Sequence, residues 1–224
     1  MTVFNHRFDP TSLREYDIRG VVGQTLRPED AFAIGRCFGS IVSRGHGKRV
    51  AVGYDGRLSS PEMEAQLVAG LRACGLEVLR IGCGPTPMLY YAAYALEADG
   101  AIMVTGSHNP PDYNGFKMML GKKPFYGRQI QEIGRMAAEG DVVPNAVGTD
   151  RAVDITEDYV ARVLQDWDGG DRALKVVWDP GNGSSAEVVK RLVARLPGTH
   201  YLLNATIDGT FPAHHPDPTV PKNL

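Results

Sequence analysis

The sequence predicts an α/β fold whose mixed, mainly parallel sheets are sandwiched by helices. Short apolar runs alternate with longer segments of helical period, which is typical of α/β proteins. Many glycines and prolines (26 and 15) separate these segments, as tight turns between short elements require. A strand–helix–strand order needs crossover connections, and these place the strands parallel to one another. With 224 residues the chain is long enough for two domains.

The first half of the chain contains the clearest elements. Three short apolar runs predict strands, at residues 50–54, 78–81 and 101–105. Three segments of helical period predict helices, at residues 28–42, 59–72 and 87–96. Ser59 begins the second helix with Glu62 three residues later and Pro61 in the first turn, so a capping box is expected there.

The second half repeats the α/β pattern after an interruption. Residues 140–154 show no sustained period and are predicted to be a linker, with a boundary near residue 150. The predicted domains are therefore two successive, similar α/β units, at residues 1–150 and 151–224. Strands are expected at 176–178 and 201–204, and helices capped by Thr156 and Ser184. Because the second pattern stops early, that domain is expected to be incomplete.

Composition and charge exclude several classes of function. A formal net charge of -2 argues against nucleic acid or an anionic membrane as partner. The three cysteines are odd in number and none forms a C-x-x-C pair, so neither a disulfide framework nor a zinc site is favoured. The first residues lack the apolar core of a signal peptide, and no apolar run has the length of a membrane span. A reducing cytoplasmic location is therefore expected.

The stretch D-G-A-I-M-V-T-G-S-H-N-P-P-D-Y-N-G-F-K, residues 99–117, carries the candidate chemistry. A strand leads into a loop that contains Ser107, and ligands of open α/β sheets bind beyond the carboxyl ends of strands. A serine hydroxyl needs a base or a cation to become a nucleophile, and His108 and Lys117 are the candidates nearby. The same residue types also make ordinary turns, so spacing alone leaves both interpretations open.

Five segments together resemble one known family. T-G-S-H-N-P and Y-N-G-F-K are similar to the active-serine loop of the α-D-phosphohexomutases, the phosphomannomutase/phosphoglucomutase family. Two segments before this loop and two after it resemble other motifs of the family, and they follow one another in the family's order. They are R-E-Y-D-I-R-G (14–20), G-Y-D-G-R (53–57), D-P-G-N-G-S (179–184) and H-H-P-D-P-T-V-P (214–221). Several ordered motifs are far more specific than any one of them.

This resemblance implies an activity and roles for individual residues. It implies intramolecular phosphoryl transfer between C1 and C6 of a mannose or glucose phosphate, through a hexose 1,6-bisphosphate. Ser107 would carry the phosphoryl group, with His108, Lys117 and Arg19 as acid/base or electrostatic helpers. Phosphoryl transfer needs positioning and neutralisation of negative charge, for which Arg and Lys are suited.

The resemblance also implies substrate or phosphate contacts. Tyr16 and Arg19 match the first motif, which lies at the family's cleft, and Asn109 belongs to the serine loop. Arg57 is open to two interpretations: a phosphate contact, or a side chain that ties down a turn through Asp55.

The implied cofactors are Mg²⁺, bound in part through the phosphate on Ser107, and glucose 1,6-bisphosphate as activator. The family's magnesium loop reads D-G-D-G-D-R. A similar segment at 166–172, D-W-D-G-G-D-R, precedes the 179–184 motif instead of following 214–221, so a solvated turn is predicted there.

The implied partners are hexose phosphates and the family's carboxyl-terminal domains III and IV, which are missing from these 224 residues. The chain alone is therefore expected to be an inactive portion of a longer enzyme. One alternative is a naturally short, non-catalytic binding or assembly module with the same fold. Another is phosphoglucosamine mutase specificity.

Overall fold

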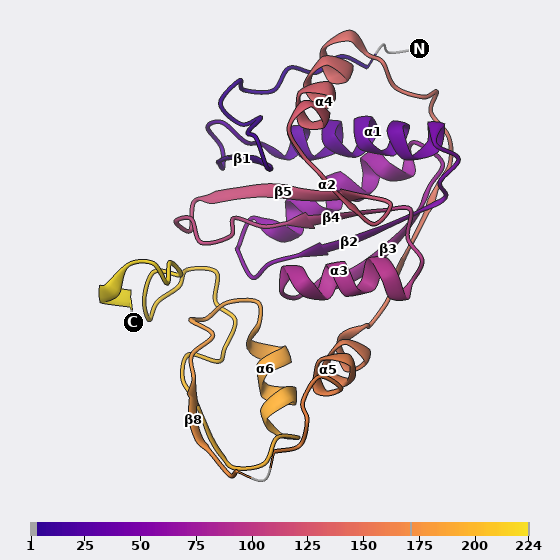
Figure 1. Ribbon diagram of the computed structural model, residues 1–224. Coiled ribbons are helices and arrows are strands. Elements are labelled where there is room, and N and C mark those ends of the chain that lie inside the picture. Colours follow the sequence, from indigo (N-terminus) through magenta and orange to yellow (C-terminus); the bar gives the residue numbers. More distant parts are fainter. Residues whose placement is uncertain (1–3, 171, 224) are drawn as a thin grey trace.

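The computed structural model describes residues 4–170 and 172–223. The first part of the chain forms a sheet in the order β1-β5-β4-β2-β3-β7, with β6 pairing β5 (Figure 1). Its strands are β1 (Ile18–Val21), β2 (Arg49–Tyr54), β3 (Glu77–Cys83), β4 (Gly100–Val104), β5 (Tyr113–Leu120), β6 (Lys123–Phe125) and β7 (Thr149–Ala152). Its helices are α1 (Pro28–Arg44), α2 (Ser60–Arg72), α3 (Thr86–Ala95) and α4 (Arg128–Glu139).

The sheet is mixed. Strands β4, β2, β3 and β7 are parallel neighbours, whereas β5 runs antiparallel to β4, β1 and β6. The predicted α/β fold with a mainly parallel sheet between helices is confirmed. Because β2, β3 and β4 are parallel, their carboxyl ends lie at one edge of the sheet, where ligands of such sheets bind.

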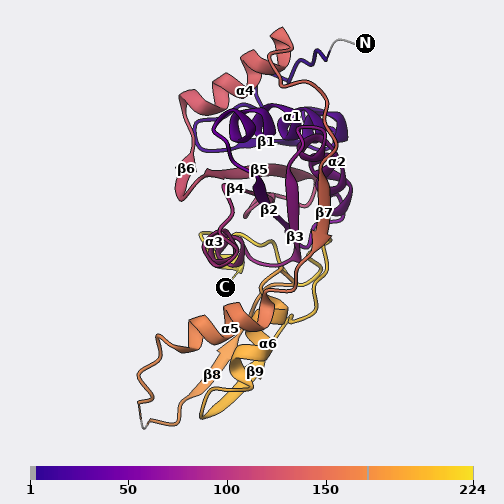
Figure 2. The same ribbon diagram turned by 90° about the vertical axis from the view of Figure 1, so that its right-hand side faces the viewer.

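Helices cover both faces of this sheet, with α1, α2 and α4 on one side and α3 on the other (Figure 2). The alternation of side chains along each strand explains the two layers. On β2, Val50 and Val52 pack into the cluster under α1, α2 and α4, while Ala51 packs against α3. On β4, Ile102 and Met103 divide in the same way.

Helices α1 and α2 approach each other closely through two glycines. A Cβ on Gly70 would lie 2.9 Å from the Arg36 nitrogen and closer still to the Phe32 carbonyl oxygen. A Cβ on Gly35 would overlap the Leu67 carbonyl and lie 3.0 Å from Gly70 Cα. The helix pair is therefore in backbone-to-backbone contact at these positions.

The remaining described residues form a smaller second unit. It contains α5 (Thr156–Leu164), β8 (Lys175–Trp178), α6 (Ala186–Val193), β9 (Thr199–Leu202) and a 3₁₀ turn (Pro221–Asn223). Strands β8 and β9 pair in parallel. Val160 of α5 and Val188 of α6 belong to the same apolar cluster as the residues of α3, which joins the two units.

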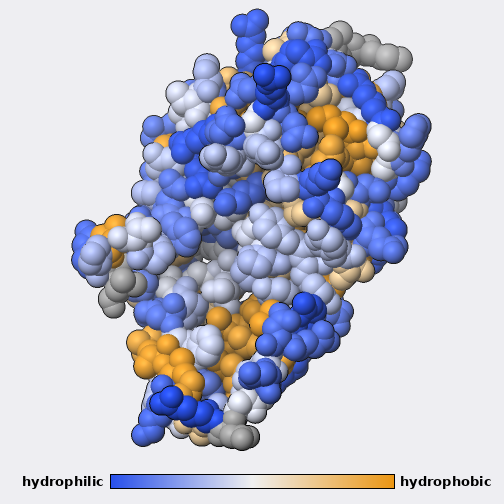
Figure 3. Space-filling view, in the orientation of Figure 1, coloured by the Kyte–Doolittle hydropathy of each residue, from blue (hydrophilic) through white to orange (hydrophobic). Residues whose placement is uncertain are grey.

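One surface of the second unit is apolar. Apolar side chains gather over the lower lobe in Figure 3, where β8 and β9 lie. The exposed large apolar residues of this region are Leu174, Val177, Tyr201, Leu202 and Leu203. None of the helices within the described ranges combines the length and the apolarity that crossing a bilayer requires.

The predicted linker at 140–154 was wrong in its last third. Thr149–Ala152 forms β7, which pairs in parallel with β3 at the edge of the first sheet. The segment T-D-R-A is polar and mostly exposed, so it lacks the apolar run that predicts β2, β3 and β4. The predicted boundary at residue 150 falls inside β7 and stays a prediction.

The three predicted side-chain caps were also wrong. Ser59 has helical dihedral angles (φ -82°, ψ -14°) rather than the extended ones of a capping residue, and its Oγ accepts a hydrogen bond from Asn114. Thr156 lies inside α5, and its backbone N–H donates to the side chain of Asp154. At α6 the capping position is Ser185 instead of Ser184, without a side-chain cap.

Candidate active site

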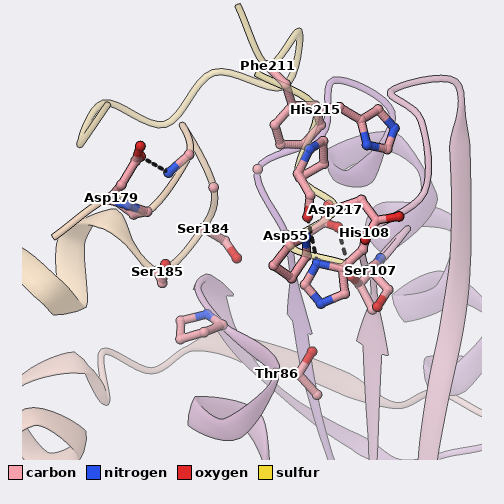
Figure 4. A pocket seen from close by; sticks show the side chains of 18 of the residues that line it. Asp55, Thr86, Ser107, His108, Asp179, Ser184, Ser185, Phe211, His215 and Asp217 are labelled. Atoms are coloured by element: carbon pink, nitrogen blue, oxygen red, sulfur yellow. Dashed lines mark hydrogen bonds between the residues drawn. The ribbon is translucent and has the colours of Figure 1, made fainter. Parts of the chain in front are cut away.

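A pocket of about 590 Å³ lies between the two units, at the carboxyl end of β2 and β4 (Figure 4). Ser107 and His108 lie on one side of it and Ser184 and Ser185 on the other, with Thr86 of α3 beneath. The further lining residues that carry polar side chains are Asp55, Thr105, Lys117, Asp179, His214, His215 and Asp217.

Asp55, directly after β2, organises the floor of the pocket. Its Oδ2 accepts hydrogen bonds from Thr105 Oγ1 (2.8 Å) and the Gly106 amide (3.0 Å). Its Oδ1 accepts from Ser60 Oγ (2.6 Å) and the Arg57 amide (3.1 Å). One buried carboxylate therefore links the end of β2, the start of α2 and the loop after β4, and its lone pairs are well satisfied.

Arg57 holds the Ser107 loop from behind. Its side chain is 1% exposed, and each of its five guanidinium N–H groups can be assigned an acceptor among the described residues. These acceptors are Asp55 Oδ2 (3.2 Å) and the carbonyl oxygens of Ser107 (3.0 Å), Asn109 (2.7 Å), Pro110 (2.5 Å) and Tyr113 (3.0 Å). The geometry fits the role of tying down a turn, because no N–H remains for a phosphate.

Gly106 packs directly against that guanidinium. A Cβ at position 106 would overlap Arg57 Cζ and lie 2.6 Å from its Nη1. Burial lowers the pKa of Arg57, and the carboxylate of Asp55 opposes the shift. The guanidinium is therefore a desolvated, charged core around which the loop is wrapped.

Ser107 has an uncommon backbone conformation for a serine, with φ +54°. Its amide donates to Thr105 Oγ1 (2.9 Å), and its carbonyl oxygen accepts from Arg57. Its hydroxyl has no hydrogen-bond partner in residues 4–170 or 172–223, and the side chain is half-buried in the pocket wall. The backbone of Ser107 is thus fixed while its Oγ is left available to a ligand.

His108 and Lys117 line the same pocket as Ser107. His108 Nδ1 lies 2.7 Å from the Pro216 carbonyl oxygen, which can only accept, so Nδ1 carries a proton. In the neutral ring Nε2 is then a proton acceptor. Lys117 comes from β5, and its ammonium makes no ion pair within the described part of the chain. A proton acceptor and a cation therefore line the pocket that the free hydroxyl of Ser107 also lines.

Arg19 lies behind the loop rather than in the pocket wall. It is 8% exposed, and its Nη2 pairs with Asp17 while Nη1 donates to the Gly106 carbonyl at 3.3 Å. Its Nε has no partner among the described residues. Asn109 also turns inward, donating from Nδ2 to the same Gly106 carbonyl.

Tyr16 is separate from this group. Its side chain is 77% exposed and stacks on Tyr126, with 6.4 Å between the ring centroids. It does not line the pocket around Ser107.

Several pocket residues of the second unit were missed as site residues. His214 Nε2 lies 3.2 Å from Asp179 Oδ2. The His215 carbonyl and then Asp179 raise the pKa of His214. Burial acts to raise the pKa of Asp179, but hydrogen bonds from Gly181, Asn204 and His214 outweigh it and lower that pKa. Both residues lie in recognised motifs, yet nothing in the sequence indicates that these motifs fold onto the Ser107 loop.

No set of three or more metal-ligating side chains occurs within the described ranges. The predicted Mg²⁺ contact through the phosphate of Ser107 therefore finds no preformed carboxylate cluster here. The segment 166–172, predicted to be a turn, contains Asp171, which lies outside the described residues. Its neighbour Gly170 donates its amide to Asp168, as a turn residue does.

Two family models match the chain. Residues 10–142 match phosphoglucomutase/phosphomannomutase alpha/beta/alpha domain I, and residues 157–224 match domain II of the same family. A phosphomannomutase/phosphoglucomutase of Pseudomonas aeruginosa is 45% identical over 96% of this chain and 46% of its own length. A phosphoglucomutase of Neisseria meningitidis is 41% identical over 94% of this chain and 46% of its own length. The chain thus spans about half the length of these relatives.

Solved structures give the same picture. A phosphoglucomutase/phosphomannomutase family protein of Burkholderia thailandensis superposes with a TM-score of 0.91 at 42% identity, over 97% of this chain and 49% of that one. The structure of a putative phosphomannomutase of Thermus thermophilus has a TM-score of 0.84 at 24% identity, which shows a shared fold.

Proposed function

The chain belongs to the phosphoglucomutase/phosphomannomutase family, and from that membership we propose that the complete protein is a phosphohexomutase. It would move a phosphoryl group between C1 and C6 of a mannose or glucose phosphate, with Ser107 as the carrier. The observation that carries this proposal is the free hydroxyl of Ser107, held on a fixed backbone in a pocket that Lys117 and His108 also line.

Each half-reaction exchanges one P–O bond for another. The bond between phosphorus and Ser107 Oγ breaks as the free sugar hydroxyl bonds to the same phosphorus, giving a hexose bisphosphate. The hydroxyl proton passes to Nε2 of His108, which its contact with Pro216 leaves as the acceptor, and then to Ser107 Oγ. The other phosphoryl group of the bisphosphate then returns to Ser107 by the reverse steps.

Lys117 would neutralise the transferring group. A phosphoserine carries a charge of about -1.5 to -2 at pH 7, so it is stable in a pocket only beside cations. The ammonium of Lys117 is the unpaired cation of the described pocket lining. Arg19 would act from behind, since its Nη1 contacts the Gly106 carbonyl within the serine loop.

Mg²⁺ and glucose 1,6-bisphosphate belong to this proposal on the family resemblance alone. The described residues offer no carboxylate cluster that fits a hard cation. The sugar contacts of Tyr16 and Asn109 also remain proposals, since the first is remote from the pocket and the second is engaged within its own loop.

Mass spectrometry of the complete protein tests the carrier role. We expect a phosphorylated peptide that contains Ser107 after incubation with glucose 1,6-bisphosphate. In a Ser107→Ala variant this phosphopeptide is absent and mutase turnover falls by about a thousandfold or more, with the thermal unfolding midpoint retained. Ser184→Ala is the matched control, because Ser184 lines the same pocket. The phosphopeptide that contains Ser107 should still form in this variant. A phosphate that maps to Ser184 or Ser185 would refute the assignment.

A further inference from the structure

We propose that Phe211 is a positioning residue for the reaction of Ser107, acting through the guanidinium of Arg57. This inference rests on the proposed function and extends it to the second unit of the chain. Arg57 Cζ lies 5.3 Å from the centroid of the Phe211 ring, over its face. Phe211 also lines the Ser107 pocket and is seen at its upper rim in Figure 4.

A further group can interact with the guanidinium of Arg57 only through the face of its plane. All five of its in-plane N–H groups are used by Asp55 and by four carbonyls of residues 107–113. An aromatic ring over the plane attracts the cation without competing for those donors, and the attraction is stronger where water is excluded. Phe211 therefore stabilises Arg57 in the one orientation that satisfies the serine loop.

The segment that carries Phe211 is fitted closely against the Arg57 turn. A Cβ on Gly209 would lie 2.6 Å from the Gly56 carbonyl oxygen and 2.7 Å from the Leu58 nitrogen. A Cβ on Gly56 would lie 2.5 Å from a methyl carbon of Ile207. The two backbones are in direct contact, so the ring of Phe211 is delivered to a defined place.

Phe211 itself has a strained backbone. Its φ is +51°, in the left-handed region that bulky residues rarely adopt. Its amide donates to the Asp208 carbonyl at 3.0 Å, which closes the turn that imposes this conformation. Such strain persists only where the surroundings determine it, and it concentrates at functional sites. The turn thus holds the ring of Phe211 on Arg57 at a cost in conformational free energy. A residue that only fills space would not need this strained backbone.

The test compares Phe211→Leu with Phe211→Tyr in the complete protein. Leucine removes the aromatic face, whereas tyrosine keeps it. For Phe211→Leu we expect kcat to fall about tenfold with KM for the hexose phosphate changed less than about twofold. Phe211→Tyr restores kcat to within about twofold of the parent. Tyr201→Leu, an exposed aromatic of β9, is the matched control for loss of a ring elsewhere in the second unit.

A second readout does not depend on turnover. The amides of Gly106, Ser107 and Asn109 are hydrogen-bonded in the loop, so their hydrogen exchange reports its integrity. Phe211→Leu should accelerate their exchange and Phe211→Tyr should not. In an Arg57→Gln background, Phe211→Leu should add little to either effect, because the cation that the ring attracts is absent.

The outcomes separate this proposal from the proposed function. If the parent protein shows no mutase turnover, the function fails, and the exchange rates of the loop alone decide the role of Phe211. If Phe211→Leu leaves kcat and loop exchange unchanged, or if its effects add fully to those of Arg57→Gln, the positioning role is refuted. Equal losses in the leucine and tyrosine variants would also refute it, since the aromatic face is then not what matters.

Discussion

Arg57 contacts the serine loop through oxygen atoms that lie 50 to 56 positions away in the sequence. Its acceptors on that loop are all backbone carbonyls, which every residue possesses. The residue types around it therefore carry no signal of the contact. Ser107, His108 and Lys117 could be proposed from the sequence because a hydroxyl, an imidazole and an ammonium group each have a recognisable role in phosphoryl transfer. For Arg57 the sequence allowed two roles, a phosphate contact or a structural contact within a turn, and only the folded loop around its guanidinium distinguishes them.

Arg57→Lys should destabilise the protein by about 2–4 kcal/mol, because lysine offers three donors and leaves buried carbonyls of the loop unpaired. Urea unfolding measures the loss. Arg44→Lys is the matched control, since Arg44 pairs with Asp141 in a half-exposed site where less than about 1 kcal/mol is expected. Equal effects of the two substitutions would contradict the role given to Arg57.

His214 should make the stability of the second unit depend on pH. Its pKa in the folded state is raised above the usual 6.5, first by the His215 carbonyl and then by Asp179. The stabilisation is complete below about pH 6.5, where the unfolded state is protonated as well, and it is lost as the pH rises through the folded-state pKa. Because the pair is partly exposed, we expect a loss of about 0.3–1 kcal/mol between pH 6 and pH 8.

Urea unfolding of the parent and of His214→Gln at both pH values checks this. Glutamine cannot be protonated, so its stability should change less between pH 6 and pH 8. An identical pH dependence in the two proteins would show that His214 does not titrate in contact with Asp179.

The apolar and helical patterns of the sequence predicted β2, β3 and β4 but not β1, β5, β6, β7 or α4. Strands β2 and β4 are buried along most of their length, and they and β3 contain the short apolar runs that predict a strand. Strand β7 pairs on one side only and is mostly exposed, so its sequence resembles a linker. The helix starts at Ser59, Thr156 and Ser184 were located to within about two residues, a usual uncertainty, although none is capped by its side chain.

The contact of α1 with α2 gives a test at the level of these elements. Gly70→Ala gains helix propensity of about 1 kcal/mol, but its Cβ meets the backbone of Phe32 and Arg36, which cannot move independently. Overpacking of this kind costs about 1–3 kcal/mol, so a net destabilisation is expected. Thermal unfolding measures it.

Gly134→Ala is the matched control on α4. There the added Cβ would meet only Leu13 Cδ1 at 2.6 Å, the end of a side chain that can rotate away. This variant should be neutral or slightly stabilised. The interpretation of the α1–α2 contact would be wrong if Gly70→Ala were as stable as Gly134→Ala.

The whole molecule combines two units that share one pocket and one apolar cluster. Val160 and Val188 of the second unit pack with α3 of the first, and residues of both units line the space around Ser107. The ordered motifs indicated that the two units belong to one enzyme family. That they face each other across the serine loop follows from packing between distant residues, for which single-sequence patterns hold no information.

Residues 1–224 alone should show no mutase turnover. The family resemblance implies that domains III and IV would bind the sugar and its distal phosphate, and the described residues hold no cluster of carboxylates for Mg²⁺. A coupled assay that follows glucose 6-phosphate formation from glucose 1-phosphate checks this, with the complete protein as positive control. Turnover by residues 1–224 alone would show that the pocket described here is sufficient.

The position of the edge strand β7 also affects the width of the pocket. Val153 extends its ladder by donating to the Arg80 carbonyl, and only residues 153–155 separate β7 from α5. If β7 shifted by two residues along β3, the same side chains of β7 would still face the core. The shift would nevertheless displace α5 and the residues after it by about 7 Å. The hydrogen-bond register of β7 on β3 therefore helps to set the distance between Ser107 and the pocket residues of the second unit. This register is fixed at a polar sheet edge, far from the atoms that react.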